Sequence, residues 1–387
     1  MKRTVVLTGG NNIESIVERL QQDNNTEVLI FDNYQKKEVK NCRTITIGEL
    51  KKIKNDVEVV IANNSIISTY ELCLQMNNND ISYTFYDEKM YFRHVLHIYG
   101  RIETGKDGLN YEWMGIDDEI TLVHKQIEKM YNTMFDKYKK EFIGKDIDVY
   151  YYYEDMPQDA YKISCIYNIP CIFSNCTTYA VSDRVIAIPN YFSCFDEKEY
   201  PWQNETQSSL RKAGERKWEY PQAFWKGDVD NTPDDLRRML YILGKKYPEY
   251  LRIENYRGFW NQVKNSDFTV EFTPMTEFAN YKYLIDIRGY SFGRMNRLLQ
   301  LGRPVLRIDS IYKEWFDEYL LPMKHFVPIK PDLSDLVEKV ELLNSREDIY
   351  NEIVDNARRF SAIYLQEESY LSKLKDITKE YISAKTD

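Results

Sequence analysis

The stretch YLIDIRGYSFGRMNRLL, residues 283–299, decides the fold that we predict for this chain. The run YLIDI predicts a short buried strand, and a small-residue loop begins after it at Arg288-Gly289. A helical stretch that carries Arg294 and Arg297 follows at once, and this strand–loop–helix order is typical of α/β sheets. Arginine near a helix start is mildly unfavourable, because the helix dipole is already positive there. An anion beside the loop would make an arginine at this position favourable.

Backbone and side chain together could hold such an anion. Free backbone N–H groups at a helix start bind anions, and glycine lets a phosphate group approach closely. An arginine in the first turn can add a charge-assisted hydrogen bond of about 1.5–3 kcal/mol. A bound diphosphate would therefore explain the placement of Arg294, whereas a solvated basic helix face remains the alternative.

A second glycine loop occurs in AFWKGDVDNTPDDLRR, residues 223–238. Lys226-Gly227 follows a predicted strand, and Arg237-Arg238 lies on the next predicted helix. This repeats the arrangement of glycine, helix and cationic groups. The triplet Asp228-Val229-Asp230 could hold a divalent metal against a sugar diphosphate, although such short triplets are common by chance.

Two carboxylates follow the apolar run in YYYEDMP, residues 151–157. Asp155, at a strand end that faces a cleft, could act as a general base. A turn-forming aspartate before Met156-Pro157 is the other interpretation. His325 lies in an apolar run, and we expect it to be structural rather than catalytic.

Composition limits the class of protein. The chain has 387 residues, 43% of them hydrophobic and 29% charged, as expected for a folded globular protein of two or three domains. The net charge of −9 disfavours a non-specific nucleic-acid binder, which needs a basic surface. We find no signal peptide, no membrane span and no Cys-x-x-Cys pair, so we expect a cytoplasmic protein with reduced thiols.

Strand and helix patterns alternate along most of the chain, which predicts an α/β fold with two lobes and a cleft between them. In the first 75 residues, Gly9-Gly10 after a strand and Asp32 after the next only partly match a dinucleotide-binding fingerprint. The predicted division is a small α/β accessory unit or part of the N-terminal lobe (1–75), an N-terminal acceptor lobe (76–210), a C-terminal donor lobe (211–345) and C-terminal helices (346–387).

Several stretches together resemble glycosyltransferase family 90, which includes protein O-glucosyltransferases and bacterial lipopolysaccharide-modifying transferases. The resemblance runs from about residue 81 to residue 360 and leaves out residues 1–75. It rests on this ordered series: YTFYDEKMYF, YYYEDMP, FSNCTTY with VIAIPNY, AFWKG, NYKYLIDIRGYSFGRMNRLLQLGRPVLRIDS and YKEWFDEYLLPMKHFVPIKPDLSDLVEKV.

The resemblance implies a GT-B architecture of two Rossmann-like lobes, a nucleoside-diphosphate sugar in the C-terminal lobe, inversion at the anomeric carbon, and no required metal or other cofactor. Asp155 matches the catalytic aspartate. The donor-binding positions that match are Gly227, Arg237, Ser291, Phe292, Gly293 and Arg294. The chain departs from the family pattern at Lys226, where arginine is usual, and in the loop before Arg294, which is one residue short. The spacing also allows Arg238 to replace Arg237.

The resemblance therefore predicts an inverting glycosyltransferase that moves a sugar from a UDP-sugar to an acceptor hydroxyl, in surface glycan, lipopolysaccharide or capsule synthesis. A binding protein without turnover and a metal-dependent transferase that uses Asp228 and Asp230 are the alternatives. The sugar, among glucose, xylose and galactose, stays open. So does the acceptor, which is a glycan, a lipid-linked glycan or a protein. We expect no nucleic-acid partner, and peripheral association with the inner face of a membrane is an open expectation.

Overall fold

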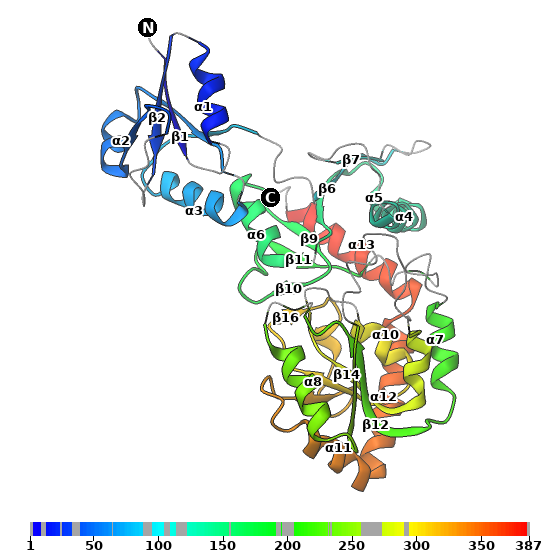
Figure 1. Ribbon diagram of the computed structural model, residues 1–387. Coiled ribbons are helices and arrows are strands. Elements are labelled where there is room, and N and C mark those ends of the chain that lie inside the picture. The colour runs from blue at the N-terminus through cyan, green and yellow to red at the C-terminus, as the bar shows by residue number, and fades with distance from the viewer. Residues whose placement is uncertain are drawn as a thin grey trace.

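Three β-sheets, each covered by helices, follow one another along the chain (Figure 1). The computed structural model describes residues 3–8, 13–23, 25–32, 39–63, 65–87, 95–103, 109–113, 122–154, 156–190, 195, 205–230, 232, 234–256, 273–289 and 294–384. The first sheet forms an N-terminal unit, the second a middle lobe and the third a C-terminal lobe.

The N-terminal unit is a five-stranded parallel sheet in the order β3-β2-β1-β4-β5. A capping box at Thr46 and Glu49 starts α2, because each side chain accepts a hydrogen bond from the other residue's backbone N–H. The elements of this unit are β1 (Arg3–Thr8), α1 (Ile13–Gln21), β2 (Thr26–Phe31), β3 (Arg43–Ile45), α2 (Ile47–Ile53), β4 (Glu58–Ile61), α3 (Ile66–Asn77) and β5 (Thr84–Phe85).

The middle lobe is a mixed sheet in the order β11-β9-β8-β6-β7, in which β6 runs antiparallel to both of its neighbours. Pro157 begins α6, where its missing N–H costs nothing. The elements of this lobe are β6 (Val95–Arg101), β7 (Leu109–Trp113), α4 (Leu122–Lys137), α5 (Lys139–Phe142), β8 (Asp146–Tyr152), α6 (Pro157–Ile166), β9 (Ile172–Ser174), β10 (Thr177–Thr178) and β11 (Val185–Ala187).

The C-terminal lobe is an all-parallel sheet in the order β13-β12-β14-β15-β17. Its β14 is buried on both faces, as parallel strands usually are: Leu284 contributes to one core and Tyr283 to another. The elements are α7 (Gln207–Gly214), β12 (Tyr220–Gly227), α8 (Leu236–Lys246), β13 (Leu251–Asn255), η2 (Met275–Asn280), β14 (Tyr281–Asp286), α10 (Arg294–Gln300), β15 (Val305–Ile308), β16 (Tyr312–Lys313), η3 (Asp317–Tyr319), β17 (Val327–Ile329), α11 (Leu336–Ser345), α12 (Glu347–Tyr364) and α13 (Glu367–Ala384).

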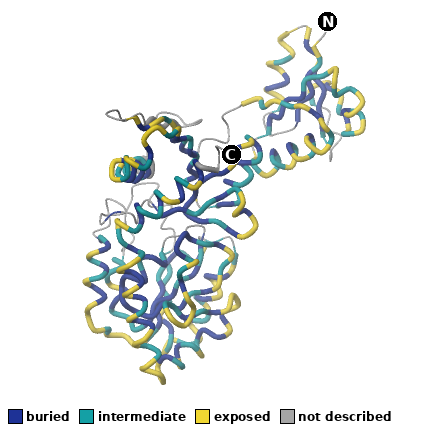
Figure 2. Tube along the Cα trace, turned by 180° about the vertical axis from the view of Figure 1, so that it is seen from behind, coloured by how far each residue is buried: buried dark blue, intermediate teal, exposed yellow. Residues whose placement is uncertain are grey.

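The two larger lobes are joined by the C-terminal helices. Figure 1 shows α13 leaving the C-terminal lobe and running back along the middle lobe, where it contacts β8 and α4. One hydrophobic core therefore contains residues of both lobes, for example Tyr151 of β8, Leu284 of β14 and Tyr370 of α13. The antiparallel pair β10–β16 makes a second connection between the lobes. In Figure 2 the buried residues form continuous segments through the sheets.

The N-terminal unit packs against the middle lobe through α3 and α6. Ile61 and Cys73 share a core with Ala160 and Ile163. The rings of Phe85 and Tyr167 lie 5.3 Å apart across the same boundary. The unit therefore buries apolar side chains of the middle lobe.

The α/β class and the GT-B-like plan of two lobes, an N-terminal unit and a helical C-terminus are confirmed. The division of the chain stays a prediction. Two of its boundaries, at residues 75 and 210, fall within helices α3 and α7. α3 and β5 extend the first unit past residue 75, because Met76 is buried in that unit's core. α7 spans residue 210. The helical stretch described from Leu122 breaks at Tyr138, which separates α4 from α5.

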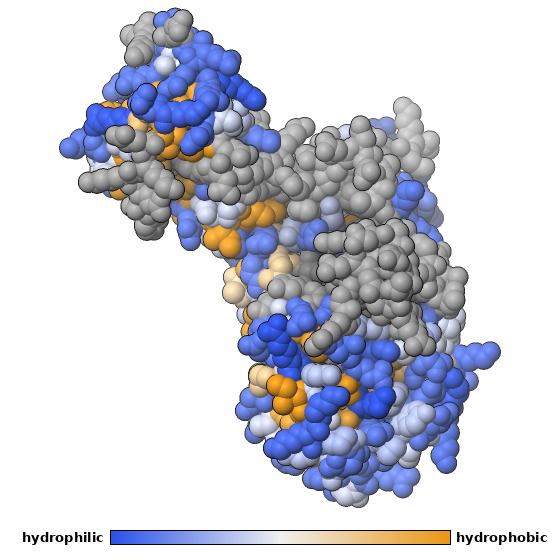
Figure 3. Space-filling view, in the orientation of Figure 1, coloured by the Kyte–Doolittle hydropathy of each residue, from blue (hydrophilic) through white to orange (hydrophobic). Residues whose placement is uncertain are grey.

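Several elements went unpredicted. Among them are the antiparallel β6 and β7, the helices α6 and α7, and strand β13. The face in Figure 3 is largely hydrophilic, and one of its apolar areas lies over α8, where Met239 and Ile242 are exposed. Among the described helices, none is both long and apolar enough to cross a membrane.

Candidate functional site

The carboxyl ends of β12 and β14 form the candidate site. These two strands are neighbours in the sheet, and the chain continues from them into helices on opposite faces, α8 and α10. The two loops therefore diverge, which makes this position the topological switch point of the sheet. In open α/β sheets, ligands bind at such a point.

The indole ring of Trp225 lies beneath two arginine side chains at this point. Trp225 is fully buried in β12. The guanidinium carbons of Arg237 and Arg294 lie 5.6 and 5.9 Å from the centroid of its ring. An aromatic face attracts a guanidinium at such a distance, so Trp225 holds both arginines over the same strand end.

Backbone carbonyls fix the direction of both arginines. Arg237 donates from Nε to the carbonyl of Arg288 and from Nη1 to the carbonyl of Asp228, each at 2.9 Å. Arg294 donates from Nη1 to the carbonyl of Lys226 at 3.2 Å. The loops after β12 and β14 are thereby connected through cationic side chains.

At Gly289 the space that a side chain would occupy is filled by the Arg237 guanidinium. A Cβ atom built there would overlap the Arg237 guanidinium and lie only 2.6 Å from its Cζ. The absence of a side chain at Gly289 thus makes room for Arg237 at the end of β14.

The electrostatics favour an anion at this position. Burial, together with the nearby charge of Arg294, lowers the pKa of Arg237 to about 10. Two guanidiniums so close together repel each other, and a bound anion would turn that repulsion into attraction. The arrangement can therefore bind a group with more than one negative charge.

A buried ion-pair network lies beside the arginines. Burial raises the pKa of Asp286, against the opposing charges of Arg307 and Arg294. Arg307 lies 3.4 Å from Asp286 and also donates to Asp317. This network connects the candidate site to the loop after β15.

The structure shows where Arg238, Gly227 and Lys226 lie. Arg238 is exposed and pairs with Asp230 and Asp235, so Arg237 is the arginine that points to the strand ends. Gly227 ends β12, where a Cβ would lie 2.6 Å from the Trp225 ring. Lys226, the position at which the family usually has arginine, turns toward Glu254 of β13 at 3.1 Å.

Arg294 is the first described residue of α10. The residue one turn later is Arg297, which pairs with the buried Glu205 at 3.4 Å. His325 accepts a hydrogen bond from the backbone N–H of Leu321, and its ring packs beside Phe360, which agrees with the structural role expected for it.

The predicted catalytic residue Asp155 and the loop residues Ser291, Phe292 and Gly293 lie outside the described residues, and so does Gly9-Gly10. The neighbour Glu154 is described and exposed, two residues after the end of β8. β8 and β9 pair in parallel, so their carboxyl ends lie side by side. The Tyr151 hydroxyl donates to Asn175 Oδ1 there at 2.5 Å.

The Asp228-Val229-Asp230 triplet forms a local turn. Asp228 accepts a hydrogen bond from the backbone N–H of Asp230, whose carboxylate also pairs with Arg238. Within the described ranges, no group of three or more histidine, cysteine, aspartate or glutamate residues could hold a metal ion.

Sequence reasoning missed the roles of Trp225 and Gly289. Trp225 is a core residue, and its ring also supports the two arginines. The adjacency of an aromatic residue to Lys226-Gly227 was the available signal. Gly289 belongs to the loop of the opening stretch, but nothing in the sequence shows that Arg237 fills the space beside it.

Three curated relatives are similar to parts of this chain. Rat protein O-glucosyltransferase 1 is 25% identical over 186 residues, which are 46% of this chain and 47% of that protein. Human protein O-glucosyltransferase 3 is 31% identical over 37% of this chain and 28% of that protein. The uncharacterized protein 179R of Invertebrate iridescent virus 6 is 33% identical over 35% of this chain and 11% of its own length. The chain thus spans about half or less of the length of these curated relatives.

Two solved structures have a loose likeness in shape to the whole chain. HepE of Anabaena in complex with UDP has a TM-score of 0.34 at 9% identity, over 98% of this chain and 100% of that one. TarM has a TM-score of 0.40 at 11% identity, over 98% and 99%.

A family model matches one continuous part of the chain. The model described as Glycosyl transferase family 90 matches residues 132–384, which include β8, the whole C-terminal lobe and most of the closing helices. This match covers well over half of the chain and contains Trp225, Arg237, Gly289 and Arg294. The chain therefore belongs to glycosyl transferase family 90.

Proposed function

We propose that this protein is an inverting glycosyltransferase that moves a sugar from a UDP-sugar to an acceptor hydroxyl. The observation that carries the proposal is the pair Arg237 and Arg294, held side by side over Trp225 at the switch point of the C-terminal sheet. A nucleoside diphosphate supplies the multiple negative charge that such a pair needs. Membership of the family and the names of the O-glucosyltransferase relatives support sugar transfer, with glucose as the first donor to test.

In this mechanism the two arginines act on the leaving group. As the bond to the anomeric carbon breaks, negative charge develops on the diphosphate, and preorganised cations stabilise it most at that moment. Asp155 takes the proton of the acceptor hydroxyl as that oxygen attacks from the opposite side of the sugar ring. A role in surface glycan, lipopolysaccharide or capsule synthesis, on a cytoplasmic acceptor, is part of the proposal.

A screen for UDP release tests this function. Purified protein is incubated with UDP-glucose, UDP-xylose and UDP-galactose, each with and without EDTA, and free UDP is measured. We expect release from at least one donor and no effect of EDTA. Loss of activity in EDTA would favour the metal-dependent alternative through Asp228 and Asp230, and UDP binding without any release would favour a binding protein.

Replacement of Arg294 by alanine is expected to weaken UDP binding by about 1.5–3 kcal/mol, because one charged hydrogen bond to the diphosphate is lost. Isothermal titration calorimetry measures the change. Arg238→Ala is the matched control, since Arg238 is exposed and paired with surface aspartates, and its UDP affinity should stay near that of the wild type. Equal affinities for Arg294→Ala and the wild type would remove this arginine from the site.

Gly289→Ala is expected to weaken UDP binding about tenfold, which corresponds to ~1.4 kcal/mol, because its Cβ displaces the Arg237 guanidinium. Gly48→Ala is the matched control, since a Cβ there meets only the Thr46 hydroxyl at 3.8 Å. A Gly289→Ala protein with unchanged UDP affinity would show that Arg237 needs no space at this position.

A further inference from the structure

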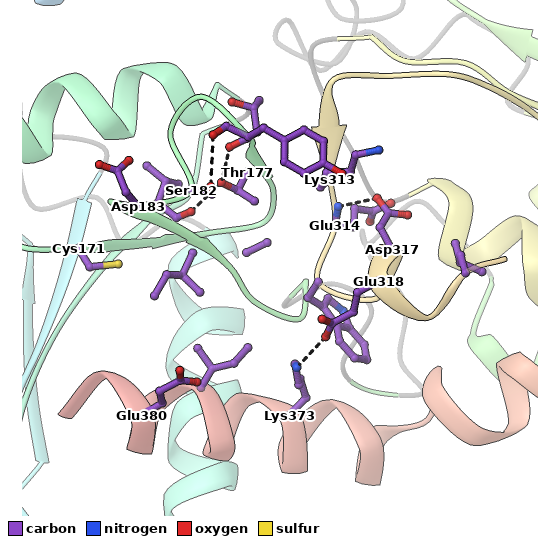
Figure 4. Close-up of a pocket in the computed structure, with 18 of the residues that line it drawn as sticks. Cys171, Thr177, Ser182, Asp183, Lys313, Glu314, Asp317, Glu318, Lys373 and Glu380 are labelled. Carbon is purple, nitrogen blue, oxygen red and sulfur yellow. Dashed lines mark hydrogen bonds and ion pairs between the residues drawn. The ribbon is translucent and has the colours of Figure 1, made fainter. Parts of the chain in front are cut away.

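A cavity of about 900 Å³ lies between the middle and C-terminal lobes (Figure 4). Its walls come from β10 and β11 of the middle lobe, from β16 and η3 of the C-terminal lobe, and from α13. The ladder between β10 and β16 lies along one side, with Thr177 paired to Lys313. A cavity of this size can bury most of a small ligand.

The walls combine apolar surface with carboxyl groups. Ile186, Ala187 and Trp315 belong to the apolar part. Acidic side chains outnumber basic ones around the cavity: the acids are Asp183, Glu314, Asp317, Glu318 and Glu380, and the bases are Arg307, Lys313 and Lys373. The cavity is therefore a poor site for an anion.

The basic side chains already have partners within the protein. Arg307 pairs with Asp286 and Asp317. Lys373 pairs with Glu318 at 3.1 Å, as Figure 4 shows, and Lys313 lies over the ring of Tyr179. By contrast, Asp183 and Glu380 have no ion-pair partner in the described part of the chain. A phosphate group in this cavity would face uncompensated carboxylates.

Glu314 adds a buried polar group to the wall. It is only 6% exposed, and the charges of Asp317 and Arg307 act on its carboxyl group. Burial and the neighbouring Asp317 raise the pKa of Glu314 well above its usual range. A carboxyl group accepts hydrogen bonds when it is ionised, and it can also donate one when it is protonated.

We propose that this cavity binds an uncharged, polyhydroxylated ligand, a saccharide, and that this saccharide carries the acceptor hydroxyl. Hydroxyl groups pair with carboxyl groups as donors and acceptors, while the C–H faces of a sugar ring pack on apolar walls. Arg307 lines the cavity and pairs with Asp286, which is close enough to Arg294 for their charges to interact. The acceptor role rests on the proposed function, whereas saccharide binding does not.

Saturation-transfer NMR and titration test the ligand class. The probes are methyl glucoside, methyl galactoside, maltose and cellobiose as neutral saccharides, and glucose 1-phosphate as the anionic one. Titrations are run without UDP and with saturating UDP, which occupies the diphosphate site. We expect at least one neutral probe to bind with a Kd of about 1 mM or below, and glucose 1-phosphate to bind more weakly in the presence of UDP.

Two cavity variants and one control variant show where the saccharide binds. Ala187→Trp fills the cavity and should weaken saccharide binding at least tenfold, whereas Ile311→Trp, at an exposed position just before β16 and outside the cavity, should leave it unchanged. Glu314→Ala is a second cavity variant, in case the tryptophan prevents folding, and it too should weaken binding. UDP affinity is measured for every variant and should not change.

The outcomes separate the two proposals. The inference is overturned if no neutral probe binds, if binding survives both cavity variants, or if the phosphorylated sugar binds more tightly through the same residues. UDP binding with no saccharide binding would reject this inference alone. Saccharide binding with no UDP binding would reject the proposed function and leave the saccharide site standing.

Discussion

Arg303→Met is expected to lower the free energy of unfolding by about 3–5 kcal/mol, because several buried carbonyl groups lose their hydrogen bonds at once. Arg303 is 3% exposed. Its guanidinium donates to the carbonyls of Ala279, Gly214, Gly302 and Arg216. These carbonyls lie in different segments around the base of the sheet, so one side chain connects α7, η2 and the end of α10.

The cost is large because methionine fills similar space but donates nothing. Each buried carbonyl left without a partner costs about 1–3 kcal/mol. Gly214 keeps one bond, from Arg358 at 3.0 Å, so the other carbonyls account for the loss. Since domains are stable by only about 5–15 kcal/mol, the change is a large part of the total.

Equilibrium denaturation in urea, followed by circular dichroism, measures the change. Arg252→Met is the matched control, because Arg252 is exposed and forms a surface pair with Glu254, worth about 0–1 kcal/mol. Arg303→Lys keeps the charge but loses the planar fork, so its stability should lie between that of the wild type and that of Arg303→Met. An Arg303→Met protein as stable as the Arg252→Met control would show that these carbonyls are satisfied in another way.

Arg303 also shows where sequence reasoning stops. The strand that follows it is β15, Val305–Ile308. Apolar runs and glycine loops mark such strands directly, because these patterns depend on near neighbours. The partners of Arg303 lie up to 89 residues away, and no local pattern encodes them.

The same limit applies to the candidate site. Arg237, Gly227 and Arg294 could be predicted, because each lies in a strand–glycine–helix pattern and in a family stretch. Trp225 lies in the same stretch as Gly227, but its contact with the arginines could not be predicted, since a buried tryptophan is expected in any parallel strand. Its second role depends on two helices that meet over it from separate parts of the chain.

The middle lobe was harder to predict for a different reason. The antiparallel β6, Val95–Arg101, carries histidine, tyrosine and arginine, and its hydrophobic alternation is weak. Helix α7 was obscured because its polar face dominates its eight residues, and only Leu210, Ala213 and two further small or polar residues are buried. Short elements with few apolar residues depend on tertiary packing, which the sequence shows only indirectly.

Asp155→Asn is expected to lower kcat by about 10²–10⁴, because the asparagine keeps the shape of the side chain but cannot accept the acceptor proton. The donor dissociation constant should stay near that of the wild type, since the arginines that hold the diphosphate are unchanged. Initial rates of UDP release with a fixed acceptor, together with UDP titration by calorimetry, separate these two quantities. A fall in donor affinity equal to the fall in rate would place Asp155 in donor binding instead.

Glu154→Gln is the control that tests whether Asp155 or Glu154 is the general base. Successive residues of an extended chain point to opposite sides, so only one of the two carboxylates can readily face the acceptor. Glu154 is exposed after the end of β8, and its replacement should therefore leave kcat within about threefold of the wild type, an effect below ~0.7 kcal/mol. If Glu154→Gln abolishes turnover and Asp155→Asn does not, the chain leaves β8 one residue out of the expected register. The base would then be Glu154, and the match of Asp155 to the family aspartate would be wrong.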